Sequence, residues 1–382
     1  MSVQHLWQDF RDRMNWSLGP LREPREHLDA AIRWILHAHA QSAEGGVPHS
    51  WDVRRQRWHA DYPETTGYII PTLLDYDAFF GAPEARLAAL RMAEWEMRVQ
   101  LTDGGVRAGT MDAEVVVPTI FNTGQVLFGW ARAFAATADE RFALALRRAA
   151  DWLVAAQDAD GCWRRFPSPF APGHPEKAYN TRSAFGLIRA FEALGERRWL
   201  DAAKANASWA MAQARPNAFL PHNCLTDAVN PLTHTLAYSM RGLMEVGVAT
   251  GEPRFIEHAI RMIDAVARHQ RADGAIPGRF TPEWQPAGRW TCLTGNSQLA
   301  INWWRLSRIT GDERFVRHAQ AASRFNMRVQ DLRLTDPERA GGIKGSHPLG
   351  EDYMTWRYPN WAAKFFCDAL MFEICPERDN LG

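Results

Sequence analysis

The sequence predicts an all-α fold, an (α/α)6 toroid in which six helical hairpins form a double ring within a single domain. Three observations lead to this prediction. A short turn with an acidic residue and an arginine recurs along the chain. A helix with one polar face follows each turn, and a second helix that is apolar nearly all round comes after it.

The recurring turn has the variants GAPEARL, ADERF, GERRW, GEPRF and GDERF. Its arginines stand at positions 86, 141, 198, 254 and 314, so they are 55 to 60 residues apart. Acidic residues just before or inside the first turn of a helix are typical of helix starts, because they interact favourably with the helix dipole. The interval therefore predicts one helical hairpin per repeat.

The helices that follow these turns are amphipathic. FALALRRAADWLVAAQ, WLDAAKANASWAMAQ and FIEHAIRMIDAVARHQ repeat apolar residues at spacings of three and four. LDAAIRWILHAHAQ, residues 28–41, is an earlier helix of this kind. Since one face is polar, we expect these helices to form the outer ring.

Six further segments are apolar nearly all round and fit an inner ring. They are ETTGYIIPTLL, NTGQVLFGWARAF, NTRSAFGLIRAFEAL, THTLAYSMRGLMEV, TGNSQLAINWWRL and PNWAAKFFCDALMFE. We expect the toroid to span residues 25–375, with an N-terminal extension over 1–24 and a C-terminal tail over 376–382. The alternative, an open α-solenoid, would require polar terminal caps and less apolar second helices.

The bulk composition excludes several classes of function. Lys plus Arg and Asp plus Glu both total 44, so bulk charge favours neither a nucleic-acid partner nor an anionic membrane. No window approaches the roughly 20 apolar residues of a membrane helix, and the N-terminal residues lack a secretory signal pattern. The five scattered cysteines indicate a reducing compartment. We therefore expect a cytoplasmic protein; its oligomeric state is left open.

Each inner helix begins with polar side chains. These are Asp61 and Glu64; Asn122, Thr123 and Gln125; Tyr179, Asn180 and Arg182; Thr233, His234 and Tyr238; Thr294, Asn296 and Gln298; and Tyr358, Asn360 and Lys364. Helix capping by Asn, Thr or Asp explains about one residue per helix. It does not explain the polar residues further along, such as Gln125 and Gln298. In a toroid these starts meet at one end, so we expect them to line a basin.

The loops before the inner helices carry aromatic residues and histidines. Aromatic faces beside neutral hydrogen-bonding groups suit a sugar ring. The alternative is that the tryptophans among these residues pack the loops onto the ring of helices. The predicted substrate-binding residues are Trp51, His59, Tyr68, Asn122, Gln125, Tyr179, Asn180, Arg182, Asn223, Asn296, Gln298, Lys344, Trp356, Tyr358 and Asn360. We expect an oligosaccharide or polysaccharide as the partner.

The hairpin pattern resembles the six-hairpin glycosidase-like enzymes, over nearly the whole chain. These include glycoside hydrolases, unsaturated glucuronyl hydrolases, polysaccharide lyases and the N-acylglucosamine and cellobiose 2-epimerases. NPLTHTLAYSMRGLMEVGVATGEPRF, residues 230–255, is similar to the epimerase segment with a His on an inner helix, which here is His234. ETTGY, residues 64–68, is similar to a motif of one inverting endoglucanase family, whose Glu is the general acid. The resemblance thus implies a sugar-processing enzyme.

Glycoside hydrolysis is the first reaction that the sequence suggests. It requires one protonated and one ionised carboxyl group. Glu64, at a helix mouth among apolar neighbours, is the predicted acid, because desolvation raises the pKa of a carboxyl. Asp61 or Asp112 is the predicted base. Capping of the inner helix is the alternative role for Glu64.

The alternative reaction is proton removal from a uronic acid, in a lyase or an epimerase. It requires a base, often His or Tyr, and a group that neutralises the carboxylate. His222 or His234, together with Tyr238, would supply this chemistry, and Asn223 lies in the same stretch. A further alternative is a glycan-binding protein without catalytic activity.

A metal or another cofactor is not expected. His222 and Cys224 form one ligand pair, but a zinc site needs three or four protein ligands. The other cysteines lie on unrelated elements. No Gly-rich phosphate loop follows a strand, which argues against nucleotide chemistry.

Overall fold

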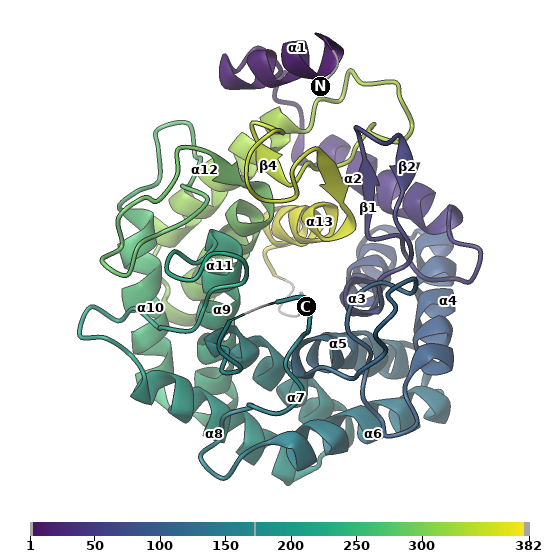
Figure 1. Ribbon diagram of the computed structural model, residues 1–382, viewed down its shortest axis with the longest axis vertical. Helices are drawn as coiled ribbons and strands as arrows, with labels where there is room; N and C mark the ends of the chain where they lie inside the picture. Colours follow the sequence, from purple (N-terminus) through teal and green to yellow (C-terminus); the bar gives the residue numbers. More distant parts are fainter. Residues whose placement is uncertain (1–2, 172, 378–382) are drawn as a thin grey trace.

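The computed structural model describes residues 3–171 and 173–377, and they form a double ring of helices (Figure 1). The inner ring consists of α3 (Pro63–Phe80), α5 (Ile120–Thr137), α7 (Thr181–Leu194), α9 (Thr233–Thr250), α11 (Leu293–Thr310) and α13 (Asn360–Ile374). The outer ring consists of α2 (Pro24–Ala40), α4 (Pro83–Val99), α6 (Glu140–Ala156), α8 (Arg197–Ala212), α10 (Pro253–Ala267) and α12 (Arg314–Val329). The predicted (α/α)6 toroid is confirmed.

The ring is closed by helices from the two ends of the chain. Each inner helix contacts the next, and α13 contacts α3. The last inner helix, α13, also packs against the first outer helix, α2. This closure distinguishes the fold from an open solenoid, in which each repeat touches only its sequence neighbours. Of the predicted C-terminal tail, 376–382, residues 378–382 lie outside the described residues.

Short turns connect most inner helices to the outer helices that follow them. Gly81, Gly195, Gly251 and Gly311 are the C-caps of α3, α7, α9 and α11, all with φ between 69° and 77°. Glycine adopts this left-handed conformation without steric cost, and an outer helix begins within a few residues. The recurring Gly-acid-Arg signature is therefore the inner-to-outer turn.

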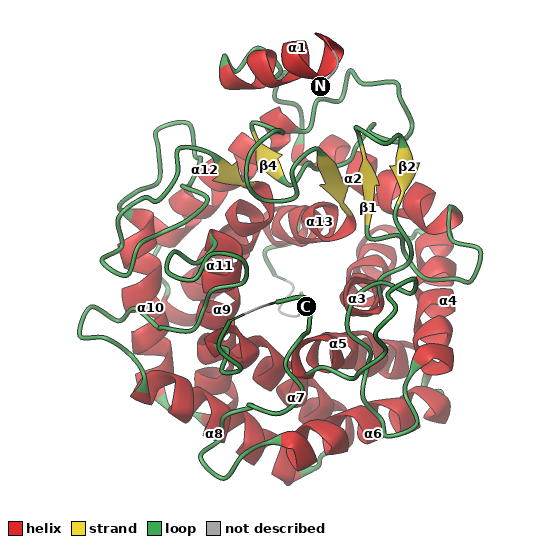
Figure 2. Cartoon of the chain, in the orientation of Figure 1, coloured by secondary structure: helices red, strands yellow, loops and turns green. Residues whose placement is uncertain are grey.

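The opposite connections, from outer to inner helices, are long and gather at one end of the ring. Short strands tie them together (Figure 2). One antiparallel sheet has the order β2-β1-β5, from β1 (Ser50–Asp52), β2 (Arg57–Trp58) and β5 (Arg357–Pro359). A second joins β3 (Thr291–Cys292) to β4 (Ser346–His347). The sequence pattern showed only irregular loops here, because strands of two or three residues have no measurable periodicity.

Neighbouring inner helices approach one another closely, and glycines permit this. A Cβ on Gly124 of α5 would lie 2.4 Å from the Cβ of Ser183 in α7. One on Gly242 of α9 would lie 2.3 Å from the Thr181 carbonyl group. The missing side chains therefore bring the inner helices together around the ring axis.

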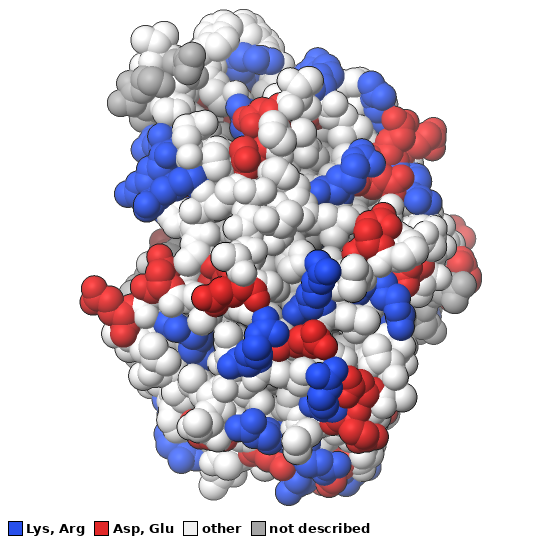
Figure 3. Space-filling view, turned by 90° about the vertical axis from the view of Figure 1, so that its right-hand side faces the viewer, with Lys and Arg blue, Asp and Glu red and all other residues white. Residues whose placement is uncertain are grey.

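The outer surface has no single sign of charge. Blue and red atoms alternate over the lower half of the face in Figure 3, in keeping with a formal net charge of zero. No described helix is both long and apolar enough to cross a lipid bilayer. Outside the ring, at the top of Figure 1, lies α1 (Val3–Arg13).

Candidate active site

A cavity of about 310 Å³ lies where the inner helices begin. Its lining from these helices comprises Glu64, Tyr68, Phe121, Asn122, His234, Thr235, Tyr238 and Trp361, and Tyr179 comes from the short 3-10 helix just before α7. The loops add His49, Tyr62, Ser168, Phe170, Ala171, Leu225, Thr226, Tyr353 and Met354. A basin therefore lies at the starts of α3, α5, α9 and α13, whereas the predicted contributions of α7 and α11 are absent from its lining. The lining runs from His49 to Trp361, which are 312 positions apart in the sequence.

The helix starts do not use their polar side chains as N-caps in the expected way. The N-cap residues of α3, α5, α7, α9 and α13 make no side-chain capping hydrogen bond. Instead, threonines in the first turn accept from the loops: the Thr66 hydroxyl from the Val47 N–H at 3.0 Å, and the Thr123 hydroxyl from the Val106 N–H at 2.9 Å. The expectation of capping was wrong for these helices, because the threonines accept from the incoming loop while they donate to the N-cap carbonyls of Tyr62 and Thr119.

Glu64 is the one carboxyl-bearing residue among the described residues that line the cavity. Burial raises its pKa to about 7, although a hydrogen bond from the Tyr62 hydroxyl opposes the rise. A carboxyl with this pKa is largely protonated in mildly acidic solution and can donate a proton. Tyr62 was missed in the sequence, although it lies only two residues before Glu64.

His234 provides a neutral imidazole in the same cavity. Burial lowers its pKa to about 4, despite a hydrogen bond with Gln298. Its Nδ1 lies 2.8 Å from Oε1 of Gln298, and because that oxygen only accepts, Nδ1 carries the proton. Nε2 is then left with a lone pair, so His234 can act as a base.

Aromatic rings form most of the cavity walls. The rings of His49 and Trp361 are 4.7 Å apart, and Phe121 lies 5.2 Å from both Tyr179 and Tyr238. The His234 ring lies 4.6 Å from the Tyr238 ring. Such walls present flat apolar faces beside hydroxyl groups, the combination that suits a sugar. Phe121, Tyr353 and Trp361 were not among the predicted site residues, and only the tertiary structure reveals that they line the cavity.

Three predicted residues, Gln125, Arg182 and Gln298, lie behind the cavity wall rather than in its lining. The Arg182 guanidinium is buried, donates to Oε1 of Gln125 at 3.4 Å and lies 4.2 Å from the centre of the Phe128 ring. The side chain of Gln298 makes a hydrogen bond with Nδ1 of His234. Their position supports residues of the lining but does not place them against a ligand in the cavity.

Asp61 and Asp112, the predicted bases, line a separate open pocket on the outer side of the loops, together with His59. The Asp61 carboxylate accepts from the Ser42 hydroxyl at 2.5 Å, and burial raises its pKa. Asp112 is exposed and accepts from the Thr110 hydroxyl at 2.6 Å. Pro63 begins α3 between Asp61 and Glu64, so the two carboxyl groups leave the chain toward different pockets.

Several predicted binding residues are engaged in hydrogen bonds within the fold. Asn296 donates to the Ala322 carbonyl at 3.1 Å, Asn360 to the Pro48 carbonyl at 2.9 Å, and Asn223 accepts from the Ser239 hydroxyl at 2.5 Å. Asn122 lines the cavity and also donates to the Arg107 carbonyl at 2.8 Å. Asn180 is buried at the end of η1 (Ala178–Asn180).

Predicted residues of the β1–β5 region and its neighbouring loop pack the loops onto the ring. Trp51 is buried, with its ring 5.5 Å from that of Trp58. Lys344 forms a buried ion pair with Asp12 at 2.7 Å. Trp356 and Tyr358 are also buried and do not line the cavity. The sequence could not separate these residues from those of the cavity, since both sets are polar or aromatic and lie in the same loops.

His222, a predicted base, is not part of the cavity lining and lies half-buried beside His174 and Glu176. Its Nε2 is 3.8 Å from Oε2 of Glu176, whose other oxygen accepts from Nε of Arg164 at 2.9 Å. One ligand atom from each of His174, Glu176 and His222 falls within 4.8 Å of the others, and Cys224 is not part of this group.

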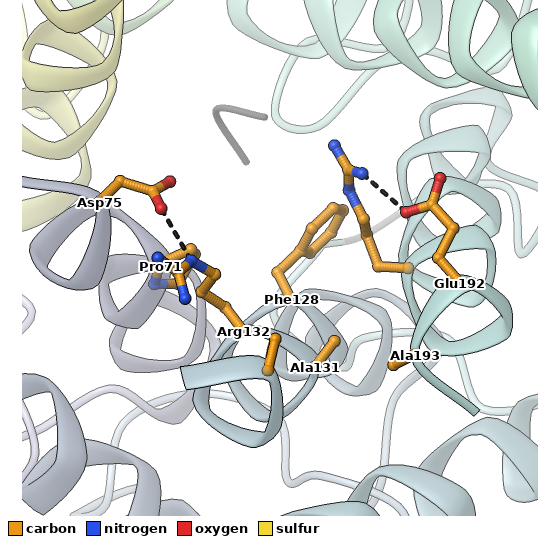
Figure 4. Close-up of a pocket in the computed structure, with 9 residues that line it drawn as sticks. Pro71, Asp75, Phe128, Ala131, Arg132, Glu192 and Ala193 are labelled. Carbon is orange, nitrogen blue, oxygen red and sulfur yellow. Dashed lines mark hydrogen bonds and ion pairs between the residues drawn. The ribbon is translucent and has the colours of Figure 1, made fainter. Parts of the chain in front are cut away.

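A second cavity, of about 220 Å³, lies near the C-terminal ends of α3, α5 and α7 (Figure 4). Asp75 pairs with Arg132 at 2.7 Å, and across the pocket Arg189 pairs with Glu192 at 2.7 Å. Pro71, Phe128 and Ala131 give it an apolar base. Its acidic groups are paired with arginines, so the first cavity remains the candidate active site.

No family model and no curated protein sequence matches this chain. Several solved structures, in contrast, match this chain in their fold. The structure is similar to that of an unsaturated glucuronyl hydrolase specific for heparin, with a TM-score of 0.74, 18% identity and coverage of 93% of this chain and 98% of that one. It is similar to a sugar epimerase from a ruminal bacterium, with a TM-score of 0.74, 12% identity and coverage of 92% and 98%.

A D-mannose isomerase is also similar, with a TM-score of 0.71, 12% identity and coverage of 92% of this chain and 97% of that chain. Identities this low show the fold alone. The chain therefore shares the (α/α)6 toroid fold of these solved structures, and this is the fold that its sequence predicted.

Proposed function

We propose that this protein is a carbohydrate-active enzyme that binds a sugar in the 310 Å³ cavity and uses Glu64 and His234 as acid and base. The observation that carries the proposal is the presence of a protonated carboxyl and a neutral imidazole in one aromatic-walled cavity. Burial holds both groups uncharged between about pH 4 and pH 7. An acid and a base that coexist at one pH are what general acid–base catalysis requires.

Hydrolysis of a glycosidic bond is one reaction open to this pair. Glu64 would protonate the leaving oxygen, and a second group would take a proton from water. Asp61 and Asp112 face another pocket, so His234 would fill the second role. The similarity to an unsaturated glucuronyl hydrolase supports this candidate.

Proton transfer at a carbon beside a carbonyl or carboxylate is the other reaction, as in epimerisation, isomerisation or β-elimination. His234 would remove the C–H proton through Nε2, and Glu64 would protonate the substrate elsewhere. The lining favours proton transfer over hydrolysis. Hydrolysis passes through an oxocarbenium-like transition state, which an ionised carboxylate stabilises. Among the described lining residues the single carboxyl, Glu64, is held neutral. The similarity to a sugar epimerase and a mannose isomerase also supports it.

A substrate panel in D₂O separates these reactions. The protein is incubated with free aldoses, neutral disaccharides and uronate-containing oligosaccharides, and the products are followed by NMR and ultraviolet absorbance. Deuterium at the carbon next to the carbonyl, or a new epimer, indicates proton transfer. New absorbance indicates elimination, and new reducing ends without either indicate hydrolysis. Glycan binding without turnover of any substrate would contradict the enzyme proposal and favour a binding protein.

A further inference from the structure

The N-terminal helix α1 has its polarity inverted relative to an ordinary surface helix. Its polar side faces the protein: Asp12 is 1% exposed and accepts from Nζ of Lys344 at 2.7 Å and from the Leu349 N–H at 2.8 Å. The Asp9 carboxylate accepts from Nε of Arg13 at 2.7 Å, and Arg13 also pairs with Glu351 at 2.7 Å. Polar contacts therefore seat this helix on residues 344–356.

The opposite side of α1 and the turn after it is apolar and open to solvent. This α1 apolar face consists of Val3, Leu6, Trp7, Phe10, Met14 and Trp16, all 44% to 82% exposed. The residues at 3, 6, 7, 10 and 14 follow helical spacing, so they form one stripe. The rings of Trp7 and Phe10 lie 5.7 Å apart, and those of Phe10 and Trp16 lie 5.4 Å apart. The face is thus continuous.

The size of this face suits an interface. Each half-exposed Trp or Phe leaves about 100 Å² in water. With the aliphatic residues the face reaches roughly 600 Å², the upper end for the largest apolar patch of a typical monomer and close to one partner's share of a small specific interface. Trp, Phe and Met are also the residues that protein interfaces favour.

We propose that the α1 apolar face is the self-association surface of the protein and that its occupant is a second copy of this chain. The charges of α1 are balanced, since Asp9 and Asp12 offset Arg11 and Arg13. Two such neutral faces can pair across a two-fold axis without repulsion. A membrane-surface helix would carry an excess of Lys and Arg beside its apolar face, and α1 has none.

Pairing of two copies would also brace the candidate active site. Residues 344–356, on which α1 rests, include the cavity residues Tyr353 and Met354. His5 of α1 lies 5.1 Å from the Trp356 ring in the same segment. The proposal does not depend on the chemistry of the cavity, and its test needs no substrate.

Sedimentation velocity over the micromolar range tests the proposal. The wild-type protein is expected to dimerise. Phe10→Glu and Leu6→Glu are each expected to weaken the dimer at least about 100-fold, because a charge would be buried without a partner. Leu144→Glu is the matched control, since Leu144 is 61% exposed on α6, far from α1 in the ring. Circular dichroism verifies that each variant is folded.

Three results would overturn the proposal. The first is a wild-type protein that stays monomeric throughout the range. The second is a dimer that survives both Phe10→Glu and Leu6→Glu. The third is binding of the wild-type protein, but not of Phe10→Glu, to vesicles of phosphatidylcholine and phosphatidylglycerol, which would assign the face to a lipid surface.

Discussion

At the scale of single residues, surroundings rather than residue type separate Glu64 from other glutamates. Glu84 offers a direct comparison, because Pro83-Glu84 begins α4 as Pro63-Glu64 begins α3. Glu84 is exposed, whereas Glu64 faces the cavity and has a pKa raised by burial to about 7. The same two-residue start thus gives an exposed side chain in the outer ring and a buried carboxyl with a raised pKa in the inner ring.

Replacing Glu64 with Gln tests its role as the acid. We expect Glu64→Gln to lower kcat by about 10²- to 10⁴-fold, since the amide keeps the shape of the side chain but cannot donate as an acid. The measurement is steady-state kinetics on whichever substrate the panel reveals. Glu84→Gln is the matched control and should leave the rate unchanged. A Glu64→Gln variant with full activity would exclude Glu64 as the acid.

The pH dependence of activity follows from the two pKa shifts. Glu64 donates only below its pKa of about 7, and His234 accepts only above its pKa of about 4. We therefore expect a bell-shaped profile of kcat/KM with its maximum between these values. In Glu64→Gln the fall on the alkaline side should disappear from the residual activity. An alkaline fall at the same pH in that variant would assign it to another group.

At the scale of elements, the position of the candidate site depends on how closely the inner helices approach. The starts of α5 and α7 meet at Gly124, and the start of α7 meets the middle of α9 at Gly242. These contacts draw the cavity residues of separate helices toward one axis. The glycines of the inner-to-outer turns have a different role, because they permit a left-handed backbone.

Two substitutions to alanine distinguish these roles. Gly124→Ala forces a methyl group against Ser183, and we expect it to destabilise the protein by about 3 kcal/mol and to reduce activity. At Gly81 a Cβ meets nothing within 4 Å, but φ is 69°, so Gly81→Ala should cost about 1 kcal/mol and spare activity. Urea unfolding measures both losses. Equal losses at the two positions would argue against tight helix contact at Gly124.

At the scale of the whole molecule, buried ion pairs stand among the apolar residues of the inner ring. Lys364 and Asp368 of α13 are both buried and form a close ion pair, and Asp368 also accepts from the Thr72 hydroxyl of α3 at 2.8 Å. This contact crosses the junction where the ring closes. The pair therefore connects helices from opposite ends of the chain.

Removing one partner of this pair should be costly. Asp368→Asn leaves the Lys364 ammonium buried without its counter-ion, and we expect a loss of about 3–5 kcal/mol in the free energy of unfolding. The double variant Lys364→Met/Asp368→Leu should recover much of this loss. Asp201→Asn breaks an exposed pair with Arg197 as a control and should cost less than about 1 kcal/mol. Similar losses for Asp368→Asn and Asp201→Asn would contradict this account.

The sequence by itself determined the ring. Helical periodicity, the recurring turn and the contrast between amphipathic and fully apolar helices are local patterns, and a closed double ring satisfies all of them at once. The sequence also located the basin at the inner-helix starts, and it named Glu64 and His234, both of which line the cavity.

Only the tertiary structure decided which polar residues face the cavity. Asp61 and Glu64 are three positions apart and equally acidic, yet they line different pockets. Asn296 and Asn360 match cavity residues in type and position, yet Asn296 binds the outer helix α12 and Asn360 binds the loop at Pro48. The physical reason is that burial follows from contacts with distant segments, such as residues 344–356, and these contacts fix both the direction of a side chain and its pKa. Periodicity reports which face of a helix is buried, but not what lies opposite that face.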